Sequence, residues 1–406
     1  MKVLVLGGGG AMGRVAVLEA TKFEFVERVT VADLNIESAK ALAADQGCCG
    51  KAEALLLDIN DVDAMHNTIR GHDIVLNTVG PFYTLGAGIL SQVIGAGRHY
   101  VDICDDWEPT LEMLALSDHA KASGVTAIIG LGASPGVTNM LAMKAAAALD
   151  EVDELVTCWS LDAGGDDTAE LKSNRPHAQG ASAAVVHWVQ QFTGTIRVLA
   201  DHGFQDVKPL QSQVIQFPGE GDVHIWSVGH PESVTLPRAV KGLRNCLNAM
   251  VGPESTFDGL RLIAKLVDDG ELTVHQGADA IANAPPSGNR KPRPDRKTLP
   301  PLFAWASGRI AGEPAVVSAH VRSMPGGGMA GATSVPLSLA LLMFAGDKQL
   351  PTGVFAPEEV LDPDTFLDLL APTSPRRTWL TCDWSASKRP MPSTPDRQTS
   401  SGAQAS

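Results

Sequence analysis

The sequence is poor in cysteine and in aromatic residues, and it has no long hydrophobic run. Six cysteines stand at positions 48, 49, 104, 158, 246 and 382, without a CxxC pair or the Cys/His spacing of a zinc site. Aromatic residues make up 5% of the chain, so we expect cores built from Ala, Val, Leu and Ile. No apolar run approaches the roughly 20 residues of a membrane helix. These absences favour a protein of the reducing cytoplasm, without an evident metal site.

Basic charge is also scarce. Asp and Glu number 46 against 32 Lys and Arg, which gives a formal net charge of −14. A nucleic-acid or anionic-membrane surface attracts a basic face, so this balance argues against both partners. The hydrophobic fraction of 44% and the charged fraction of 19% are typical of a globular protein, and 406 residues suggest two or three domains.

The first 130 residues alternate short apolar runs with amphipathic stretches of about ten residues. Because parallel strands need a crossover between them, this alternation predicts a parallel sheet with helices on both faces. The predicted strands are 2–6, 28–32, 54–57, 73–77, 99–103 and 125–129, and the predicted helices are 11–21, 36–44, 62–69, 85–96 and 108–122. The expected fold class is therefore α/β, with a Rossmann doubly wound parallel sheet.

The alternation changes after residue 135. Helices are predicted at 138–149, 181–192, 335–344 and 363–370, and strands at 154–161, 196–199, 214–217 and 315–320. Fewer helices between the strands indicate a second, α+β domain with a mixed or antiparallel sheet. Residues 285–301 are rich in Pro, Arg and Lys and are expected to form an exposed loop. Residues 385–406 are rich in Ser, Thr, Pro and Gln, which predicts a disordered tail.

A glycine-rich turn follows the first predicted strand. Gly8, Gly10 and Gly13 form a GxGxxG pattern, in which Ala11 and Met12 open the next helix. The tight turn, the approach of backbone to a pyrophosphate and the close packing of helix on strand each exclude a Cβ atom. The free N–H groups of the helix start then face the phosphates. Gly7, Gly9 and Gly13 fit a longer variant of the same motif.

Asp33 ends the second predicted strand, 20 positions after Gly13. A carboxylate there accepts both ribose hydroxyls of NAD and repels the 2′-phosphate of NADP. Leu34 offers no guanidinium to offset that repulsion. The sequence therefore predicts NAD binding in preference to NADP, although Arg14 or Lys40 could still reach a phosphate.

Two further loops follow predicted strands on the side where Rossmann domains bind ligands. Asp58 ends the third strand, where it would either hydrogen-bond the adenine or start the turn before the next helix. Asn77 ends the fourth strand and is followed by Gly80 and Pro81. These residues would hold backbone near the nicotinamide ribose, or form a plain Gly-Pro turn. We assign Asp58, Asn77, Gly80 and Pro81 to the predicted cofactor site.

Acidic residues gather where the fifth strand ends. Asp102 and Cys104 share one side of the extended chain, and Asp105 and Asp106 follow. Clustered carboxylates raise one another's pKa, which can give a base poised near neutral pH. We therefore predict catalytic roles for Asp102 and Asp105, against the alternative that these aspartates cap a turn. Cys104 has no paired histidine in the sequence to make it a nucleophile.

The second domain offers candidate substrate ligands. Arg175 could clamp a carboxylate and His177 could relay protons, unless both lie in an exposed loop. His230 and Glu232 form another polar group, and Arg238 is a second candidate for binding an anion. His187, on the helix predicted at 181–192, is expected to be structural.

Several stretches resemble the saccharopine dehydrogenase family. They are Val3–Arg14, Val31–Asp33, Asp73–Phe82, Ala96–Ile103, Gly132–Asn139 and Gly353–Glu358. The resemblance implies a Rossmann domain that binds NAD(P), a second domain that often mediates homodimer formation, and a C-terminal return to the first domain. It also implies an oxidoreductase that oxidises an amine or reduces an imine of a small amine or amino acid.

Together, the pattern and the resemblance divide the chain into four parts. Residues 1–130 form the dinucleotide-binding domain, 131–334 the substrate and dimerisation domain, 335–384 the returning segment and 385–406 the tail. The activity expected is hydride transfer to or from a C–N bond, with NAD as cofactor. Two alternatives remain at this point, namely an oxidoreductase of carbonyl or hydroxyl groups and a catalytically silent NAD-sensing module.

Overall fold

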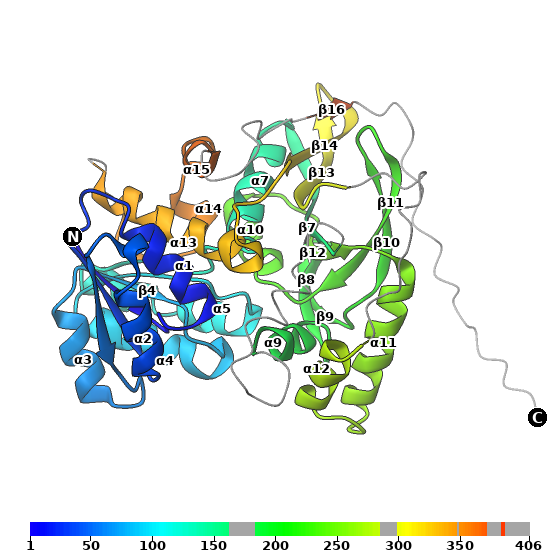
Figure 1. Ribbon diagram of the computed structural model, residues 1–406. Coiled ribbons are helices and arrows are strands. Elements are labelled where there is room, and N and C mark those ends of the chain that lie inside the picture. The colour runs from blue at the N-terminus through cyan, green and yellow to red at the C-terminus, as the bar shows by residue number, and fades with distance from the viewer. Residues whose placement is uncertain (162–182, 285–298, 347–348, 372–382, 386–406) are drawn as a thin grey trace, which may run out of the picture.

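The computed structural model describes residues 1–161, 183–284, 299–346, 349–371 and 383–385. Two sheets lie side by side in it, one near each end of the molecule in Figure 1. The first sheet has the order β15-β6-β5-β4-β1-β2-β3, and all of its pairs are parallel. Its strands are β1 (Lys2–Leu6), β2 (Arg28–Asp33), β3 (Ala52–Leu56), β4 (Ile74–Asn77), β5 (His99–Asp102), β6 (Thr126–Ile128) and β15 (Gly353–Phe355).

Helices connect these strands as the sequence predicts, except that the single helix predicted at 108–122 is two helices separated by a turn. The helices are α1 (Ala11–Ala20), α2 (Ile36–Ala43), α3 (Val62–Arg70), α4 (Phe82–Gly95), α5 (Trp107–Leu114) and α6 (Ser117–Ala122). All four residues of β4 are buried, and so are four of the five in β1, as expected for central parallel strands covered on both faces. The Rossmann architecture is confirmed. Strands β1 to β3 extend the sheet in one direction and β4 to β6 in the other, so the strand order reverses between β1 and β4, and ligands are expected at the carboxyl ends of these two strands.

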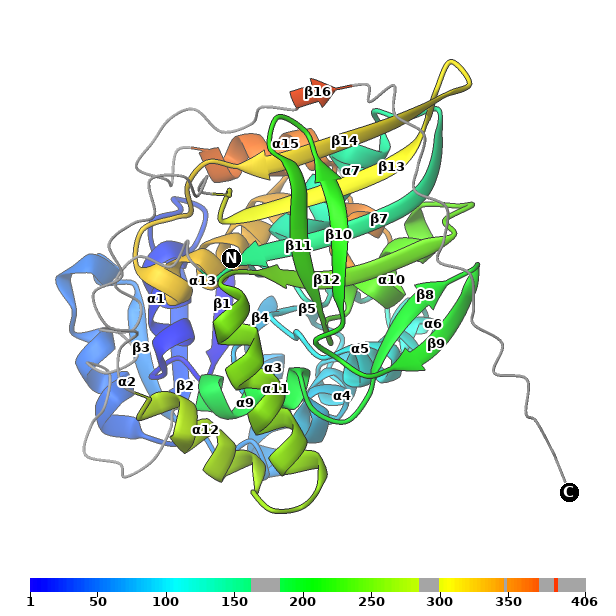
Figure 2. The ribbon, with the colours of Figure 1, turned by 90° about the vertical axis from the view of Figure 1, so that its right-hand side faces the viewer.

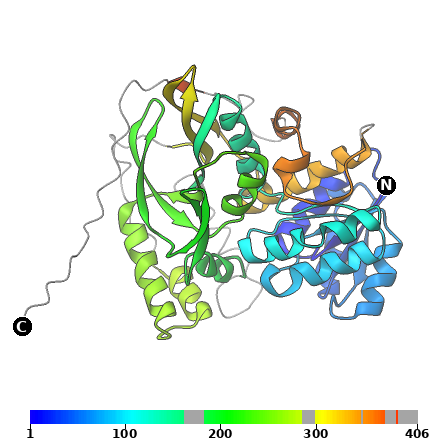
Figure 3. The same ribbon diagram turned by 180° about the vertical axis from the view of Figure 1, so that it is seen from behind.

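The C-terminal part of the chain lies against this first sheet. Strand β15 extends the sheet by pairing in parallel with β6. Helix α13 (Gly328–Ala345) packs on α1, and the Ser338 hydroxyl donates to the Ala16 carbonyl at 3.2 Å. Figure 3 shows α13 over the Rossmann helices from behind. Among the described residues, α13 is the one helix long and apolar enough to span a membrane, and half of it is buried inside the protein. We therefore interpret α13 as a core helix.

The second sheet is mixed. Its main path is β10-β11-β12-β7-β13-β14-β16, and β8 pairs with β12 and β9 (Figure 2). Among the described strands, the β7–β12 pair is parallel and the others are antiparallel. The strands are β7 (Glu151–Ser160), β8 (Ile196–Ala200), β9 (Gly203–Val207), β10 (Ser212–Phe217), β11 (Gly221–Val228), β12 (Asn245–Val251), β13 (Leu302–Ile310), β14 (Glu313–Val321) and β16 (Asp383–Ser385). The predicted α+β character is confirmed.

The other described helices are α7 (Val137–Ala146), α9 (Ala183–Gln191), α10 (Glu232–Ala239), α11 (Glu254–Asp268), α12 (Val274–Ala282), α14 (Pro357–Val360) and α15 (Pro363–Leu370). Helix α10 contacts both α5 and α14, and α15 packs on α7. One hydrophobic cluster includes Val5 of the first sheet, Met140 of α7, Leu236 of α10 and Ala304 of the second sheet. This continuous core places α10 beside the Rossmann sheet, and side-chain contacts with Asp105 place α9 at the carboxyl end of β5.

Candidate active site

The glycine turn leaves no room for side chains. Gly7 has φ +72°, which favours glycine. A Cβ on Gly13 would lie 2.2 Å from the Gly7 carbonyl oxygen, and one on Gly8 would lie 2.6 Å from Val31 Cγ1. Gly10 is the N-cap of α1, so Ala11 and Met12 occupy its first turn. These contacts fit both predicted glycine registers, and the turn can receive a pyrophosphate because the N–H groups at the start of α1 have no carbonyl partner within the helix.

Asp33 closes one side of this turn. Its Oδ2 accepts from Gly9 N at 2.9 Å and its Oδ1 from Asn35 N at 2.8 Å. The neighbouring Leu34 side chain is 70% exposed. The two cations that could have received a 2′-phosphate are engaged elsewhere, because Arg14 pairs with Asp45 at 2.8 Å and Lys40 with Glu37 at 3.0 Å. The carboxylate thus stands where a ribose is expected, without a basic neighbour committed to it.

The loops after β3 and β4 have different exposure. Asp58 Oδ1 accepts from Asn60 N at 2.9 Å and so shapes the turn before α3, as the turn alternative predicted. Asn77 is fully buried. It cannot contact a cofactor directly, because its Oδ1 accepts from Val79 N and its Nδ2 donates to the Tyr100 hydroxyl, both at 2.9 Å. Gly80 and Pro81 are exposed at the start of α4, in reach of a ligand.

Asp102 is also fully buried. Its Oδ1 accepts from Cys104 N at 3.0 Å and from Gly130 N at 2.7 Å. Burial raises the pKa of Asp102 to about 6, although the two backbone N–H groups favour its ionised form. This position corrects the expectation that Asp102 touches cofactor or substrate, since its carboxylate faces protein on all sides. Cys104 is buried too, and burial raises the pKa of its thiol, which argues against a nucleophile.

Asp105 meets side chains of the second domain. Its Oδ1 lies 2.8 Å from His187 Nε2, and its Oδ2 accepts from Gln191 Nε2 at 2.9 Å. Asp106 Oδ1 lies 3.3 Å from the same His187 nitrogen. The Asp105 side chain is 31% exposed, against 17% for His187 and 13% for Asp106. Asp105 is therefore the member of this cluster that a substrate can reach.

The three side chains of this cluster, Asp105, Asp106 and His187, have pKa values that differ widely. Burial favours neutral Asp105, but the charge and hydrogen bond of His187 outweigh it and lower the pKa of Asp105 to about 2. Burial, then the charge of Asp105, raises the pKa of Asp106 to about 7. Burial disfavours protonated His187, yet Asp105 and then Asp106 raise its pKa to about 9. The ligand atoms of the three residues lie within 4.8 Å of one another, a spacing compatible with a metal ion.

A hydrogen-bonded chain continues from this cluster into the second domain. The ionised Asp105 can only accept, so the Gln191 amide group turns its Nε2 toward it and its Oε1 toward His230 Nε2, 3.0 Å away. This orientation places a proton on His230 Nε2. His230 Nδ1 lies 3.3 Å from the Ser134 hydroxyl, which donates to Glu232 Oε1 at 2.6 Å.

Glu232 ends this chain in the interior. The side chain is fully buried, and its Oε1 also accepts from Thr138 Oγ1 at 2.8 Å and from Asn248 Nδ2 at 3.0 Å. Three donors on one carboxylate oxygen offset the cost of burying the charge. Glu232 thus holds the start of α7, the start of α10 and strand β12 together beneath the junction between the domains.

The remaining predicted residues lie elsewhere. Arg175 and His177 fall outside the described residues, as do most of the loop predicted at 285–301 and all but the first residue of the predicted tail. Arg238 pairs with Glu359 at 3.1 Å, so it offers no dedicated anion clamp. The sequence analysis missed Gln191 and gave His187 only a structural role. Their four-residue spacing on one helix face was the available signal.

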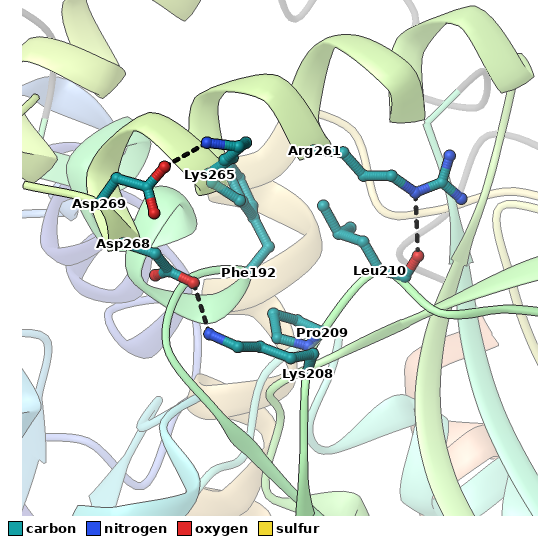
Figure 4. Close-up of a pocket in the computed structure, with 9 residues that line it drawn as sticks. Phe192, Lys208, Pro209, Leu210, Arg261, Lys265, Asp268 and Asp269 are labelled. Atoms are coloured by element: carbon teal, nitrogen blue, oxygen red, sulfur yellow. Dashed lines mark hydrogen bonds and ion pairs between the residues drawn. The ribbon is translucent and has the colours of Figure 1, made fainter. Parts of the chain in front are cut away.

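A surface hollow of about 300 Å³ lies between α11 and the start of β10, away from these residues (Figure 4). Its cations are already engaged: Lys208 pairs with Asp268 at 2.7 Å, Lys265 with Asp269, and Arg261 donates to the Leu210 carbonyl. Paired charges on an open surface give little to a ligand, so we place the active site where the loop after β5 meets α9 instead.

Glu358 gives a prediction for stability. It is 6% exposed, Asn139 Nδ2 donates to its Oε2 at 2.8 Å, and burial raises its pKa from the ordinary 4.5 to about 7. Between these values the unfolded chain loses a proton that the native state keeps, so the free energy of unfolding falls as pH rises, by ~1.4 kcal/mol per unit. Glu358→Gln keeps an oxygen for Asn139 and removes the charge.

Between pH 4.5 and pH 7, Glu358 should lower the free energy of unfolding of the unmodified protein by ~3 kcal/mol. Glu358→Gln lacks the ionisable group, so this part of the decrease should be absent from the variant. Denaturant unfolding at several pH values measures this difference. The exposed Glu37→Gln is the control and should change nothing. An unchanged pH dependence in Glu358→Gln would show that Glu358 is ionised in the native state at acidic pH.

Residues 3–128 match the family model of the saccharopine dehydrogenase NADP binding domain. Two relatives align with most of the chain. A carboxyaminopropylagmatine dehydrogenase of Synechocystis is 24% identical over 400 residues, and the alignment covers 90% of this chain and 94% of that one. This chain is also 24% identical over 412 residues to a carboxynorspermidine synthase of Vibrio cholerae, covering 91% and 94%. The similarity to these relatives therefore extends across both domains.

Solved structures share the fold. The apo saccharopine dehydrogenase (L-Glu forming) of Saccharomyces cerevisiae superposes with a TM-score of 0.61 at 14% identity, covering 95% of this chain and 100% of that one. A homospermidine synthase of Legionella pneumophila in complex with NAD gives 0.59 at 13% identity, covering 95% and 91%. The resemblance seen in the sequence is confirmed: the chain carries a dinucleotide-binding domain of saccharopine dehydrogenase type and is an NAD(P)-dependent oxidoreductase that acts on a C–N bond.

Proposed function

We propose that the enzyme uses NAD and acts on a small amine or amino acid, whose reacting nitrogen faces Asp105. The observation that carries this proposal is the contact of Asp105, from the loop after β5, with His187 and Gln191 of α9. The contact joins the edge that binds the nicotinamide in Rossmann folds to the second domain. A partly exposed carboxylate at that junction suits a cationic nitrogen.

The glycine turn and Asp33 fit a dinucleotide. Gly8 and Gly13 leave a cradle that a Cβ would fill, and Asp33 lies beside Gly9. We expect the exposed Leu34 to cover one face of the adenine, and Gly80 and Pro81 to support the nicotinamide end. A nicotinamide held there would supply the acceptor for a hydride from the amine carbon, or the donor of a hydride to an iminium carbon.

The residues of the cluster have separate roles in charge stabilisation and proton transfer. Before hydride leaves the carbon, the ammonium must lose a proton, and afterwards the carbon–nitrogen group is an iminium cation. Asp105, whose pKa is lowered by His187, stays ionised and stabilises that cation. Asp106 and His187, with pKa values raised to about 7 and about 9, lie behind Asp105 and exchange the proton with the substrate through it. In the reductive direction the same groups return the proton to the amine.

Cofactor choice gives a testable prediction. Asp33→Ser combined with Leu34→Arg removes the repulsion and adds a guanidinium, so the ratio of the NAD and NADP dissociation constants should shift toward NADP by ~10²-fold or more. Leu34→Arg alone keeps the carboxylate and is the matched control, with a smaller shift expected. Equal dissociation constants for the two nucleotides in the unmodified protein would refute the preference.

The substrate class is tested by following reduced nicotinamide over a panel of amines, amino acids and alcohols, with NAD and NADP side by side. The clustered carboxylates favour cationic amines, and the names of the relatives refer to amine products or substrates. We expect activity with an amine or amino acid. Activity confined to alcohols would contradict the proposal and favour the carbonyl alternative.

Three coarser expectations belong with this proposal. We expect a homodimer formed through the second domain, where Phe204 and Val214 of β9 and β10 are 53% and 52% exposed. We expect a cytoplasmic enzyme, in keeping with the free cysteines of the described residues. The domain boundaries at residues 130, 334 and 384 also stay predictions.

A further inference from the structure

Three buried polar side chains lie at the carboxyl ends of two neighbouring strands. Asn77 and Asp102 are paired residues in the parallel β4–β5 register, and Tyr100 lies two residues before Asp102. All three are fully buried. A polar side chain in such a place costs free energy unless its hydrogen bonds are made, so their partners indicate what they do there.

Their partners are loop backbones. Asn77 accepts from Val79 N, in the loop after β4, and donates to the Tyr100 hydroxyl. Asp102 accepts from Cys104 N, in the loop after β5, and from Gly130 N, in the loop after β6. The first loop leads to Gly80 and Pro81, the second carries Asp105 and the third leads to Ser134. The loops that carry Gly80, Pro81 and Asp105 are thus tied to these buried side chains.

A second contact shows how closely the last two loops fit. Gly130 has φ +73°, and a Cβ there would lie 2.9 Å from the Cys104 carbonyl oxygen. The loops after β5 and β6 therefore touch backbone to backbone at the point where Asp102 joins them. A change at Asp102 would move both loops, and with them Asp105.

We infer that Asp102 is a positioning residue, which sets the place of Asp105 by joining the loops after β5 and β6. This inference rests on the proposed role of Asp105. A single oxygen, Oδ1, accepts both N–H groups, so an asparagine oxygen can take its place. A positioning role therefore needs the acceptor and not the ionisable group, and this separates it from proton transfer.

The test compares Asp102→Ala with Asp102→Asn in the full-length enzyme. Asp102→Ala should lower kcat by ~10²-fold, as small misplacements of reacting groups do, and leave the dissociation constant of NAD within a few fold. Asp102→Asn should restore kcat to within a few fold of the unmodified enzyme and leave the pH profile in place. The exposed Asp118→Asn serves as the control for the substitution chemistry.

Amide hydrogen exchange gives a readout that needs no substrate. Exchange at Cys104 and Gly130 should accelerate in Asp102→Ala and stay slow in Asp102→Asn.

A second variant is available if Asp102→Ala does not fold. Gly130→Ala keeps Asp102 and displaces the same contact between the two loops, so it should lower kcat in the same way. Equal loss of kcat in Asp102→Asn and Asp102→Ala would overturn the inference, and so would full turnover in Asp102→Ala. An unmodified enzyme that turns over no amine would instead contradict the proposed function, while the exchange result would still decide the loop contact.

Discussion

Asp105→Asn should lower turnover by ~10²–10³-fold, the range typical of a group that stabilises charge developing in the transition state. The substitution removes the charge that would stabilise an iminium, and it also removes the main attraction that keeps His187 protonated. Binding of NAD should change by no more than a few fold, because the glycine turn and Asp33 lie elsewhere on the sheet edge. Steady-state kinetics with a cofactor-binding measurement separates the two effects.

The same variant makes a spectroscopic prediction. The pKa of His187 is raised to about 9 in the unmodified protein, with Asp105 as the largest cause that raises it. Asp105→Asn should therefore lower that pKa, which a titration of the His187 ring followed by NMR would report. Asp45→Asn, which breaks a surface pair with Arg14, is the matched control and should affect neither turnover nor His187. Full turnover in a folded Asp105→Asn enzyme would remove Asp105 from the mechanism.

Gly13→Ala should weaken NAD binding by ~10²-fold or more and lower the melting temperature. The added methyl would lie 2.2 Å from the Gly7 carbonyl oxygen and 2.6 Å from Gly8 Cα, so α1 must move away from the turn that holds the pyrophosphate. Overpacking of this kind costs ~1–3 kcal/mol. Calorimetric titration with NAD and thermal unfolding measure the two effects separately.

Gly259→Ala is the matched control for this change. Gly259 lies within helix α11, and nothing stands within 4 Å of a Cβ built there. Alanine should stabilise that helix by ~0.5–1 kcal/mol and leave NAD binding unchanged. NAD affinity retained in Gly13→Ala would show that the turn can widen without losing the cofactor.

The first domain could be predicted in detail because its signals are local. Each strand of the Rossmann sheet is a short apolar run bounded by glycine or aspartate, and the glycine turn specifies the contact that follows β1. Asp33 could be identified for the same reason, since its distance from Gly13 is set by one helix and one strand.

The second domain could be predicted only in outline. Strands β9, β11, β12 and β13 and helices α10, α11 and α12 were missed. Strand β12 pairs in parallel with β7, which is distant in the sequence. Strands β9, β11 and β13 each form a hairpin with a neighbouring strand, and their hydrophobic patterns did not identify them. The contact of Asp105 with Gln191 joins residues 86 positions apart, which no local pattern reveals. Burial misled the analysis at Asp102, since strand alternation places a side chain on a face without telling whether that face is covered.

The central claim is tested most directly with NADH that carries deuterium at C4. The measurement follows that deuterium into the product. The enzyme is supplied with an oxo compound and an amine, separately and together, and the product is examined by mass spectrometry. The account predicts deuterium on the carbon bonded to nitrogen, and only when oxo compound and amine are both present. Deuterium in an alcohol formed without the amine would contradict it.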